Sequence, residues 1–397
     1  LTEENIAYSR KIAQKSIVLL KKPQVAPKFS LQKMDRFIDS LITEMTLEEK
    51  LGQLYQRHGG RSQNLNSKID AIEKNLILNG QVSSYLNVTG VERVKELQKI
   101  AVEESRLGIP LLFALDVIHG FRTTFPVPLA MSCSWDPEAI EKAAHIAANE
   151  ATAVGLNWTF SPMVDIARDP RWGRIVEGAG EDAYLGSMVA KAYVRGYQQN
   201  DLYKTTSLLA CPKHFVAYGA AIGGRDYNSA DISEQTLYEI YLPPFHAAIE
   251  EGAATLMSGF NDIAGIPMTA NKSLLTNLLR RSWKFDGFVV SDWNAIFELT
   301  NHSVAGDSAT AGKIALEAGV DMDMVSGIFQ KNLKQLIEDR TLSESYVNQA
   351  VRRILKAKYK LGLFEDPYRY CDLSREKNEI LTEENIAYSR KIAQKSI

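Results

Sequence analysis

The chain has 397 residues, of which 45% are hydrophobic and 24% are charged, and its formal net charge at pH 7 is −2. This composition is that of an ordinary globular protein, and the length leaves room for one large domain with added helices. A near-neutral charge and the lack of any apolar run of about 18 residues exclude a basic nucleic-acid binder and a membrane-spanning chain, so we expect neither partner.

The two ends of the chain carry the same segment. Residues 1–17, LTEENIAYSRKIAQKSI, recur letter for letter as residues 381–397. Repeat architectures need several stacked units with a steady period, whereas this segment occurs twice at opposite ends. We interpret the duplication as a feature of an engineered or rearranged chain. Each copy is a candidate amphipathic helix, with Ile6, Ala13 and Ile17 spaced for one face of the first copy.

The duplicated segments suggest where the main domain begins and ends. After the first copy, Val18-Leu19-Leu20 resembles the start of a strand, and Pro23 and Pro27 then form a linker. We therefore expect residues 1–29 to be a duplicated linker helix with the start of a strand. The main domain is predicted at residues 30–370, and a C-terminal linker helix at residues 371–397.

Within residues 30–370 the pattern alternates between helices and strands. A helix is expected from Met34 to Glu48, with a new helix start at a Thr46-Leu47-Glu48-Glu49 capping box. Eight short apolar runs are strand candidates: 52–57, 82–87, 111–116, 156–164, 207–215, 254–260, 286–292 and 319–325. Helical patterns occur at 137–153, 184–198, 233–251, 272–282 and 342–362. Buried strands alternating with helices predict a parallel sheet, and eight such units favour an α/β fold of the (β/α)8 TIM-barrel type, as a single domain with extra terminal helices.

Several of the apolar runs end abruptly in a polar residue. Asp116, the tandem Lys213-His214, and Asp292 each follow such a run. The carboxyl ends of parallel barrel strands are where this fold builds active sites. Asp292 is the strongest candidate, because a rigid strand end can aim a carboxylate nucleophile and the adjacent Trp293 offers a flat face for a sugar ring. The alternative is that Asp292 caps the helix that follows.

Two loops add further charged groups. Arg174 lies in a loop rich in donors and acceptors that also contains Glu177, and Arg225-Asp226 follows the Lys213-His214 tandem. For the Arg174 loop the alternative interpretation is a structural ion-pair loop, and for Arg225-Asp226 it is a solvated loop or a helix cap. The three cysteines are scattered without a zinc-like spacing, and Asp321 and Asp323 have no clustered histidines, so we expect no metal and no other cofactor.

Taken together, six motifs resemble one known family. They are ALDVIHG (114–120), DPRWGRIVEGAGEDAYL (169–185), KHFVAYG (213–219), GGRDYN (223–228), MSGFNDIAG (257–265) and GFVVSDW (287–293). In order and spacing they resemble the first domain of glycoside hydrolase family 3, and within it the bacterial periplasmic β-glucosidases. The resemblance covers residues 30–397 and implies a retaining β-glucosidase barrel.

The resemblance also implies roles for individual residues. Asp292 matches the nucleophile. The positions that bind the hydroxyl groups of the terminal sugar match Asp116, Arg174, Lys213, His214 and Arg225. Phe260 stands where many members carry a Tyr, so a hydroxyl donor is missing there, and Trp293 matches an aromatic lining of the sugar site. Retaining hydrolysis further needs a second carboxyl group, which acts as the acid/base.

The second carboxyl group is not visible in the sequence. In two-domain members it comes from a domain after the barrel, and this chain stops at Ile397, where the resemblance places the start of that domain. Single-domain members use an Asp-His pair in the loop that corresponds to residues 219–226, which here contains no His. We therefore expect a β-glucosidase that is weak or inactive for want of its acid/base domain. The alternative is an engineered, non-catalytic isolated barrel that keeps residual sugar binding.

The expected partner is a small-molecule or oligosaccharide β-glucoside, although the sequence does not choose between glucosides and xylosides. Self-association is also possible, either through the surface that a second domain would cover or through exchange of a terminal helix. Members of the resembled subgroup are periplasmic, while residues 1–29 do not have the pattern of a signal peptide, so the compartment stays open.

Overall fold

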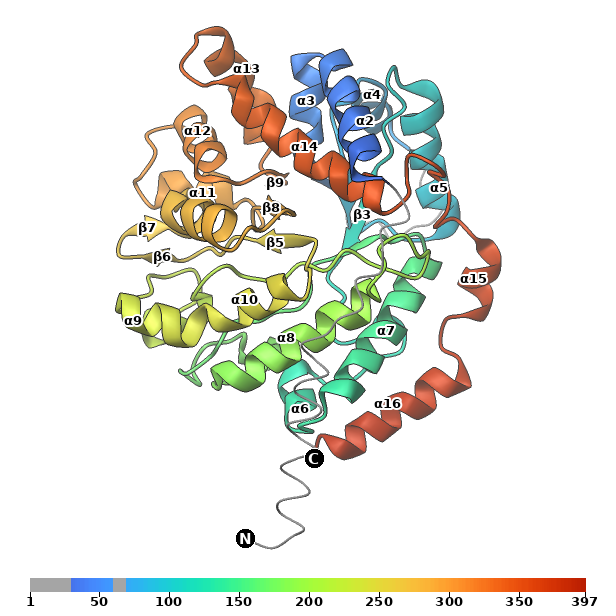
Figure 1. Ribbon diagram of the computed structural model, residues 1–397, viewed down its shortest axis with the longest axis vertical. Coiled ribbons are helices and arrows are strands. Elements are labelled where there is room, and N and C mark those ends of the chain that lie inside the picture. The colour runs from blue at the N-terminus through green and yellow to red at the C-terminus, as the bar shows by residue number, and fades with distance from the viewer. Residues whose placement is uncertain (1–29, 60–68) are drawn as a thin grey trace, which may run out of the picture.

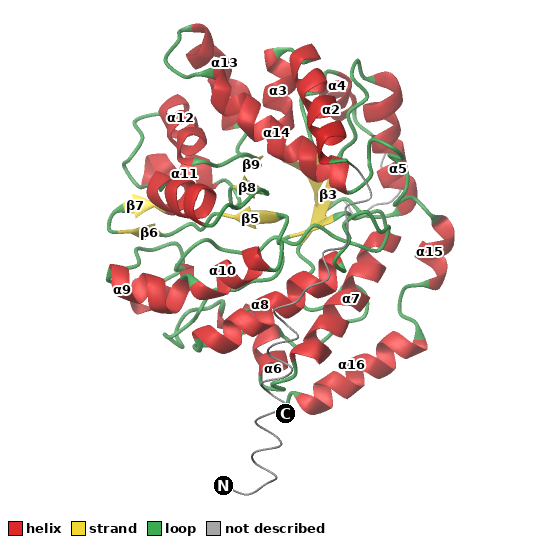
Figure 2. Ribbon diagram, in the orientation of Figure 1, coloured by secondary structure: helices red, strands yellow, loops and turns green. Residues whose placement is uncertain are grey.

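The computed structural model describes residues 30–59 and 69–397. In the described part, short strands form a central ring and helices surround it (Figures 1 and 2). The strands are β1 (Tyr55–His58), β2 (Ser84–Leu86), β3 (Leu112–Leu115), β4 (Trp158–Thr159), β5 (Thr255–Met257), β6 (Asp262–Ile263), β7 (Ile266–Pro267), β8 (Phe288–Val290) and β9 (Asp323–Met324).

The α-helices form the outer layer of the barrel and its extensions. They are α2 (Leu31–Glu44), α3 (Leu47–Gln53), α4 (Ala71–Leu78), α5 (Val91–Lys99), α6 (Pro128–Ser132), α7 (Pro137–Ala153), α8 (Ala183–Gln198), α9 (Glu234–Thr236), α10 (Pro243–Glu250), α11 (Ala295–Asn301), α12 (Ser308–Ala318), α13 (Ile328–Glu338), α14 (Glu344–Lys360), α15 (Leu373–Asn378) and α16 (Glu383–Lys395). The 3-10 and π-helical segments are η1 (Ile100–Glu104), η2 (Ile175–Glu177), η3 (Tyr218–Ala220), η4 (Ile222–Gly224), η5 (Leu237–Tyr241), η6 (Met268–Ala270) and η7 (Ser273–Ser282).

The strand pairing closes into a barrel. One sheet has the order β4-β3-β2-β1-β9 and a second pairs β5 with β8, and every one of these pairs is parallel. A parallel bridge between Val290 and Met322 joins β8 to β9. Between β4 and β5 runs the segment 208–215, bridged to β4 through Leu209 and to the end of β5 through Phe215. The predicted α/β barrel is therefore confirmed.

The wall between β4 and β5 is less regular than expected. Residues 156–164 were predicted as one strand, but only Trp158–Thr159 is regular, and the predicted strand at 207–215 pairs only through isolated bridges. Pro212 has no N–H to donate, which interrupts a ladder in the middle of a sheet. The main chain next to it instead carries Lys213 and His214, both nearly fully buried.

Local sequence signals set most of the helix boundaries. At the start of α3, the Thr46 hydroxyl accepts the N–H of Glu49, and the Glu49 carboxylate accepts the N–H of Thr46 at 2.9 Å. This confirms the predicted capping box. The segment predicted at 137–153 is α7, capped by Asp136. The long helix expected at 233–251 is wrong as one helix. It is broken into α9, η5 and α10, because Pro243 and Pro244 interrupt the hydrogen-bond ladder and begin a new helix.

A small hairpin, β6–β7, extends from the wall beyond β5 and was not among the predicted strands. Its two-residue turn is Ala264-Gly265, with φ values of 52° and 77°. Positive φ at both positions is what a tight hairpin turn requires, and glycine adopts it without steric cost. The strands are only two residues long, below the length at which an alternating pattern becomes recognisable.

Aromatic side chains fill the inside of the barrel. The Trp158 ring is fully buried, and its centroid lies 4.7 Å from that of Phe160 and 5.0 Å from that of Phe288. Its indole N–H donates to the Thr255 hydroxyl at 2.9 Å. This cluster ties β4, β5 and β8 together, so the loops that leave these strands start from fixed points.

The second copy of the duplicated segment forms α16, which packs against α6 and α7 (Figure 1). Ile392 is buried there, the Tyr388 hydroxyl donates to Ala139 O at 3.1 Å, and the Ser389 hydroxyl donates to Thr124 O at 2.6 Å. The packed face thus contains tyrosine and serine in addition to apolar groups.

The face predicted from Ile6, Ala13 and Ile17 is wrong for this copy. The matching residues Ile386 and Ile397 are 37% and 107% exposed, because the helix turns its Tyr388 side to the domain. The first copy, with the strand start at Val18-Leu19-Leu20, lies outside the described residues. The boundary at residue 370 and the interpretation of the duplication stay predictions.

Candidate active site

The predicted site residues follow the carboxyl ends of the barrel strands. Asp116 comes directly after β3, and Asp292 comes two residues after β8. Lys213 and His214 end the irregular segment between β4 and β5. Since the strands are parallel, these ends all lie at the same face of the barrel. The fold therefore gathers at one face residues that are up to about 180 positions apart in the sequence.

The Asp292 carboxylate is buried and half-satisfied. Its side chain is 11% exposed, and its Oδ1 accepts the main-chain N–H of Trp293 at 2.6 Å. Its Oδ2 lies 3.5 Å from Nε2 of His214 and has no hydrogen-bond partner among the described residues. The capping alternative does not hold, because Asn294 occupies the N-cap of α11. A buried oxygen without a partner is a feature that calls for a functional explanation.

Burial and neighbouring charges act in opposite directions on Asp292. Burial raises the pKa of its carboxyl group to about 7, while the cations Lys213 and Arg174 and the Trp293 N–H oppose that rise. The Asp116 carboxylate raises the pKa of Asp292 further, by a smaller amount. Asp292 is therefore poised to change its protonation state near neutral pH, as expected for a group that takes part in chemistry.

Lys213 and Asp116 form an ion pair across the face of the barrel. The Lys213 ammonium lies 2.5 Å from Asp116 Oδ1. The Lys213 side chain is only 4% exposed, whereas that of Asp116 is 48% exposed. The pair thus presents a carboxylate with free acceptor capacity to solvent and keeps the cation beneath it. Such an arrangement suits hydrogen bonding to a polyhydroxylated ligand.

Arg174 is held by a bidentate pair with Glu177. Its Nε and Nη2 donate to the two carboxylate oxygens at 2.7 and 3.0 Å, and its guanidinium lies 5.6 Å from the centroid of the Tyr218 ring. This confirms that the loop contains structural ion pairs, and a second one joins Asp169 to Arg171. The ion pair also orients Arg174 close enough to affect the Asp292 charge.

Asp165 is a further buried charge that the sequence analysis did not single out. Its Oδ2 accepts the main-chain N–H of His214 at 2.9 Å and lies 2.8 Å from Nδ1 of the same residue. Both side chains are at most 1% exposed. The signal was available, because Asp165 directly follows the apolar run 156–164, in the same way that Asp292 ends the run 286–292.

A separate aromatic cluster lies under the site. It contains Trp172, Tyr218 and Phe260, all nearly fully buried, together with Met163 and Ala295. The Phe260 ring centroid is 5.7 Å from that of Tyr218. The Trp172 indole N–H donates to Asp226 at 2.9 Å, so the Asp226 carboxylate holds this cluster in place. Phe260 therefore has a packing role that requires no hydroxyl group.

Two predicted site residues are exposed and are held by few contacts. Trp293 follows Asp292 and is 44% exposed, with its ring 5.2 Å edge-on from His58. Arg225 is exposed, and its guanidinium forms no ion pair or hydrogen bond with the described residues. The structure thus brings together Asp116, Arg174, Lys213, His214 and Asp292, sets Phe260 and Trp293 beside them, and does not fix Arg225.

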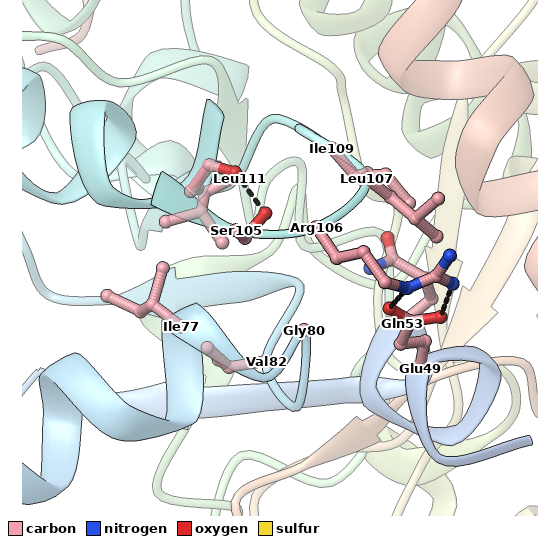
Figure 3. A pocket seen from close by; sticks show the side chains of 11 residues that line it. Glu49, Gln53, Ile77, Gly80, Val82, Ser105, Arg106, Leu107, Ile109 and Leu111 are labelled. Carbon is pink, nitrogen blue, oxygen red and sulfur yellow. Dashed lines mark hydrogen bonds and ion pairs between the residues drawn. The ribbon is translucent and has the colours of Figure 1, made fainter. Parts of the chain in front are cut away.

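A pocket at the opposite end of the barrel differs from this site in the side chains that line it (Figure 3). It is lined by Gln53, Val82 and Leu111, which precede β1, β2 and β3. Its charged groups are Arg106 and Glu49, which bind one another, with Arg106 Nε 2.9 Å from Glu49 Oε1. None of the predicted site residues lines this pocket.

No group of three or more His, Cys, Asp or Glu side chains in residues 30–59 and 69–397 is arranged to hold a metal ion. In the same described part, no helix is long and apolar enough to cross a membrane. What the site does offer is a row of cationic and carboxylate groups beside Asp292 Oδ2, which has no hydrogen-bond partner among the described residues. This combination can bind hydroxyl groups while the free oxygen faces a reactive carbon.

The sequence of this chain is similar to those of known proteins. The family described as "Glycosyl hydrolase family 3 N terminal domain" matches residues 46–357. The chain is 40% identical over 336 residues to a periplasmic beta-glucosidase of Salmonella typhimurium, covering 85% of this chain and 43% of that protein. It is 37% identical over 330 residues to a beta-xylosidase of Formosa agariphila, covering 77% and 45%.

A solved structure shows the same likeness in three dimensions. The beta-glucosidase from Listeria innocua in complex with glucose superposes with a TM-score of 0.85 at 41% identity, covering 91% of this chain and 51% of that one. The chain therefore spans about half the length of the relatives it matches, 43% and 45% for the two curated proteins.

Proposed function

This chain belongs to glycoside hydrolase family 3, and on that premise we propose that its barrel carries the sugar-binding site and the nucleophile of a retaining β-glucosidase. Asp292 is the nucleophile of this proposal. The single observation that supports it best is the Oδ2 oxygen of Asp292, which is buried and lacks a hydrogen-bond partner among the described residues. A nucleophile needs such a free oxygen, held rigidly at a strand end.

The proposed reaction begins with glycosyl transfer to the protein. Asp292 Oδ2 forms a bond to the anomeric carbon of the terminal glucosyl unit, while the bond from that carbon to the aglycone oxygen breaks. The aglycone leaves with a proton from a general acid, or as a phenolate when its oxygen is sufficiently acidic. Water then hydrolyses the glycosyl ester and restores the Asp292 carboxylate. Asp292 must be ionised for the first step, and Lys213 and Arg174 favour that form.

Substrate binding is assigned to the charged groups beside Asp292. Asp116 has acceptor capacity on its exposed side, while Lys213 and His214 lie buried and Arg174 lies partly buried around the same face. Arg225 and Trp293 are proposed to close on the sugar only when it is bound, since both are exposed without it. A relative with the printed name beta-glucosidase and another with the printed name beta-xylosidase leave the sugar to be tested. We propose a glucoside.

The second carboxyl group of the reaction is proposed to come from outside the described residues. The carboxylates near Asp292 are already engaged: Asp116 pairs with Lys213, Asp165 binds His214, Glu177 pairs with Arg174, and Asp226 binds Trp172. Loss of a general acid costs on the order of 10²–10⁴ in rate, and less when the leaving group needs no proton. This chain is therefore expected to cleave aryl glucosides with acidic phenols far better than cellobiose.

The proposal is tested by trapping the glycosyl intermediate. The protein is incubated with 2,4-dinitrophenyl 2-deoxy-2-fluoro-β-glucoside, and its intact mass is measured. We expect one fluoroglucosyl unit on the chain, none on Asp292→Ala, and unchanged labelling on the surface control Asp339→Ala. The corresponding 2-fluoroxyloside, run in parallel, decides between the two sugars. Sugar binding without any label would favour the alternative, a non-catalytic barrel, and full activity on cellobiose would contradict the missing acid.

We also propose that the face around the site docks further protein, from a second domain or a second copy of the chain. Val176, Ile222, Tyr227 and Trp293 lie on the loops of this face and are 44–56% exposed, more apolar surface than a solvent-facing rim needs. Exchange of terminal helices is a second route, although the first copy of the duplicated segment lies outside the described residues. Sedimentation velocity is expected to show self-association. A strict monomer at high concentration would remove both routes of self-association and leave only a second domain as the occupant of this face.

A further inference from the structure

His214 is held from behind by one carboxylate oxygen. Asp165 Oδ2 lies 2.9 Å from the main-chain nitrogen of His214 and 2.8 Å from its ring Nδ1. The oxygen accepts the main-chain N–H, so it already acts as an acceptor. The simplest assignment is that Nδ1 also carries a proton and donates it to the same oxygen. A neutral His214 ring then has no proton on Nε2.

The other side of the ring faces Asp292. Nε2 of His214 lies 3.5 Å from Asp292 Oδ2, which has no hydrogen-bond partner among the described residues. An unprotonated Nε2 and an ionised Oδ2 are both acceptors, and two facing acceptors repel unless a donor lies between them. A proton bound by one of the two groups can supply this donor directly, because 3.5 Å leaves no room for another atom on the line between them. In a complex, a hydroxyl group of the sugar can donate to the pair instead.

We propose that Asp165 is a positioning residue of this site, which fixes the ring of His214 with Nε2 turned to Asp292 and couples the three groups into one unit that shares a proton. The inference rests on the proposed function only in its last step, where that proton must leave before Asp292 attacks. It assigns Asp165 a role that packing alone does not explain. A side chain needed only to fill space would not have to be a carboxylate at a fully buried position.

The electrostatics of the unit agree with this geometry. Burial raises the pKa of both carboxyl groups, Asp165 and Asp292, to about 7. Burial, with help from the cations Arg174 and Lys213, holds the pKa of the His214 ring well below its usual range. Groups that interact this closely titrate together and not one by one.

Other groups surround the unit and must be kept in any test. The Glu177 carboxylate raises the pKa of Asp165, and Asp116 does the same to Asp292. Tyr218 packs its ring edge-on to the His214 ring, with 5.1 Å between centroids. Because Arg174 is paired with Glu177 and Lys213 with Asp116, the net charge of these outer groups stays fixed when only Asp165 is changed.

Asp165→Asn is the informative variant. The Asn carbonyl oxygen can accept both N–H groups of His214, so the ring keeps its orientation while the negative charge is lost. A nearby negative charge stabilises a bound proton, so removing it lowers the pKa of the remaining His214–Asp292 pair. We expect a downward shift of about one to two pH units, from one charge acting over several ångströms at an effective dielectric constant near 20.

The first readout does not depend on activity. Nitrogen-15 NMR of the His214 ring, assigned with His214→Gln, is followed with pH in the sugar-free protein and in Asp165→Asn. We expect the Nδ1–H form at high pH and a titration whose midpoint falls in the variant. An Nε2–H form in the unchanged protein, or equal midpoints, would overturn the inference. The unchanged protein alone decides the tautomer if the variant fails to fold.

The second readout uses the labelling reaction. The rate of fluoroglucosyl labelling is measured against pH, each protein relative to its own plateau. We expect the acid limb of Asp165→Asn to move in the same direction as the NMR midpoint. Asp165→Ala, which releases the ring, should raise the half-saturating inhibitor concentration. An acid limb that stays fixed would limit Asp165 to a structural role. The expected NMR result without any labelling would refute the proposed function and leave the positioning role in place.

Discussion

The two ends of the barrel both bury charged groups but treat them differently. At the amino ends of the strands, the Asp321 carboxylate accepts hydrogen bonds from the guanidinium groups of Arg280 at 2.5 Å and Arg353 at 2.7 Å. It also accepts the main-chain N–H of Val289 at 2.8 Å. At the carboxyl ends, Asp292 Oδ2 has no hydrogen-bond partner among the described residues. A buried charge with full partners holds a fold together, whereas one left without a partner has to be explained by what it does.

The neighbouring groups repeat this contrast. Near the amino ends, the fully buried Lys358 donates to Gln53 at 2.8 Å, and Gln53 also accepts the hydroxyl of Ser83 at 3.2 Å. The pocket of Figure 3 lies at this end and contains a closed Arg106–Glu49 pair. Across the barrel, Asp165 Oδ1 is a second buried oxygen without a partner in the described part of the chain. The difference predicts that substitutions at the amino ends of the strands change stability, whereas substitutions at the carboxyl ends change activity.

The largest effect is expected for Asp292→Asn. Removing the nucleophile should lower the labelling rate by about 10⁴-fold or more. The free energy of unfolding should stay the same or rise, because a buried carboxylate with an unsatisfied oxygen is replaced by a neutral group. Labelling kinetics and urea unfolding measure the two quantities on the same sample. A variant that loses stability and labelling together would contradict the proposed contrast between the two ends of the barrel.

The converse is expected for Asp321→Asn at the other end. It leaves the guanidinium groups of Arg280 and Arg353 without their charge partner, and breaking a buried pair in this way costs about 3–5 kcal/mol. Urea denaturation should show this loss in the free energy of unfolding, while the folded fraction should still be labelled at Asp292. A stability loss below about 1 kcal/mol would mean that the buried pair does not hold the barrel together.

A smaller loss is expected for Lys358→Met. Burial holds the pKa of the Lys358 amine well below its usual range, so the substitution removes a hydrogen-bonding group with little charge. Gln53 keeps its bond from Ser83. We expect a cost of about 1–3 kcal/mol, below that of Asp321→Asn. Equal losses in the two variants would show that hydrogen bonding and not charge pairing dominates at this end.

The smallest effect from one pH unit to the next, at most about 1.4 kcal/mol, is a slope of stability with pH. The folded pKa of Asp292 is about 7 against an ordinary value of 3.8, so between these two values the folded protein binds more protons than the unfolded chain at this group. Its contribution to stability is therefore present at low pH and is lost as the pH rises towards 7. Thermal unfolding from pH 4 to 8 should show a shallower decline in Asp292→Asn than in the unchanged protein, and identical declines would contradict the raised pKa.

Much of the site could be predicted from the sequence, because its charged motifs lie where the predicted strands end. Asp116, Lys213, His214 and Asp292 each follow an apolar run, and the parallel fold brings such positions to one face. Asp165 was missed although it follows the run 156–164, because that run was treated only as a strand. Its partner His214 lies 49 positions later, and no local pattern joins the two.

The sequence by itself determined the alternation of strands and helices, the capping box at Thr46, and the strand ends that carry charge, because these depend on neighbours a few residues apart. It did not determine the broken segments at Pro212 and Pro243 or the turned face of α16, where packing outweighed local pattern. Only the tertiary structure decided which charges are paired. Asp321 and Asp292 are both Asp residues beside buried strands, and their difference lies in which side chains the barrel places around each of them.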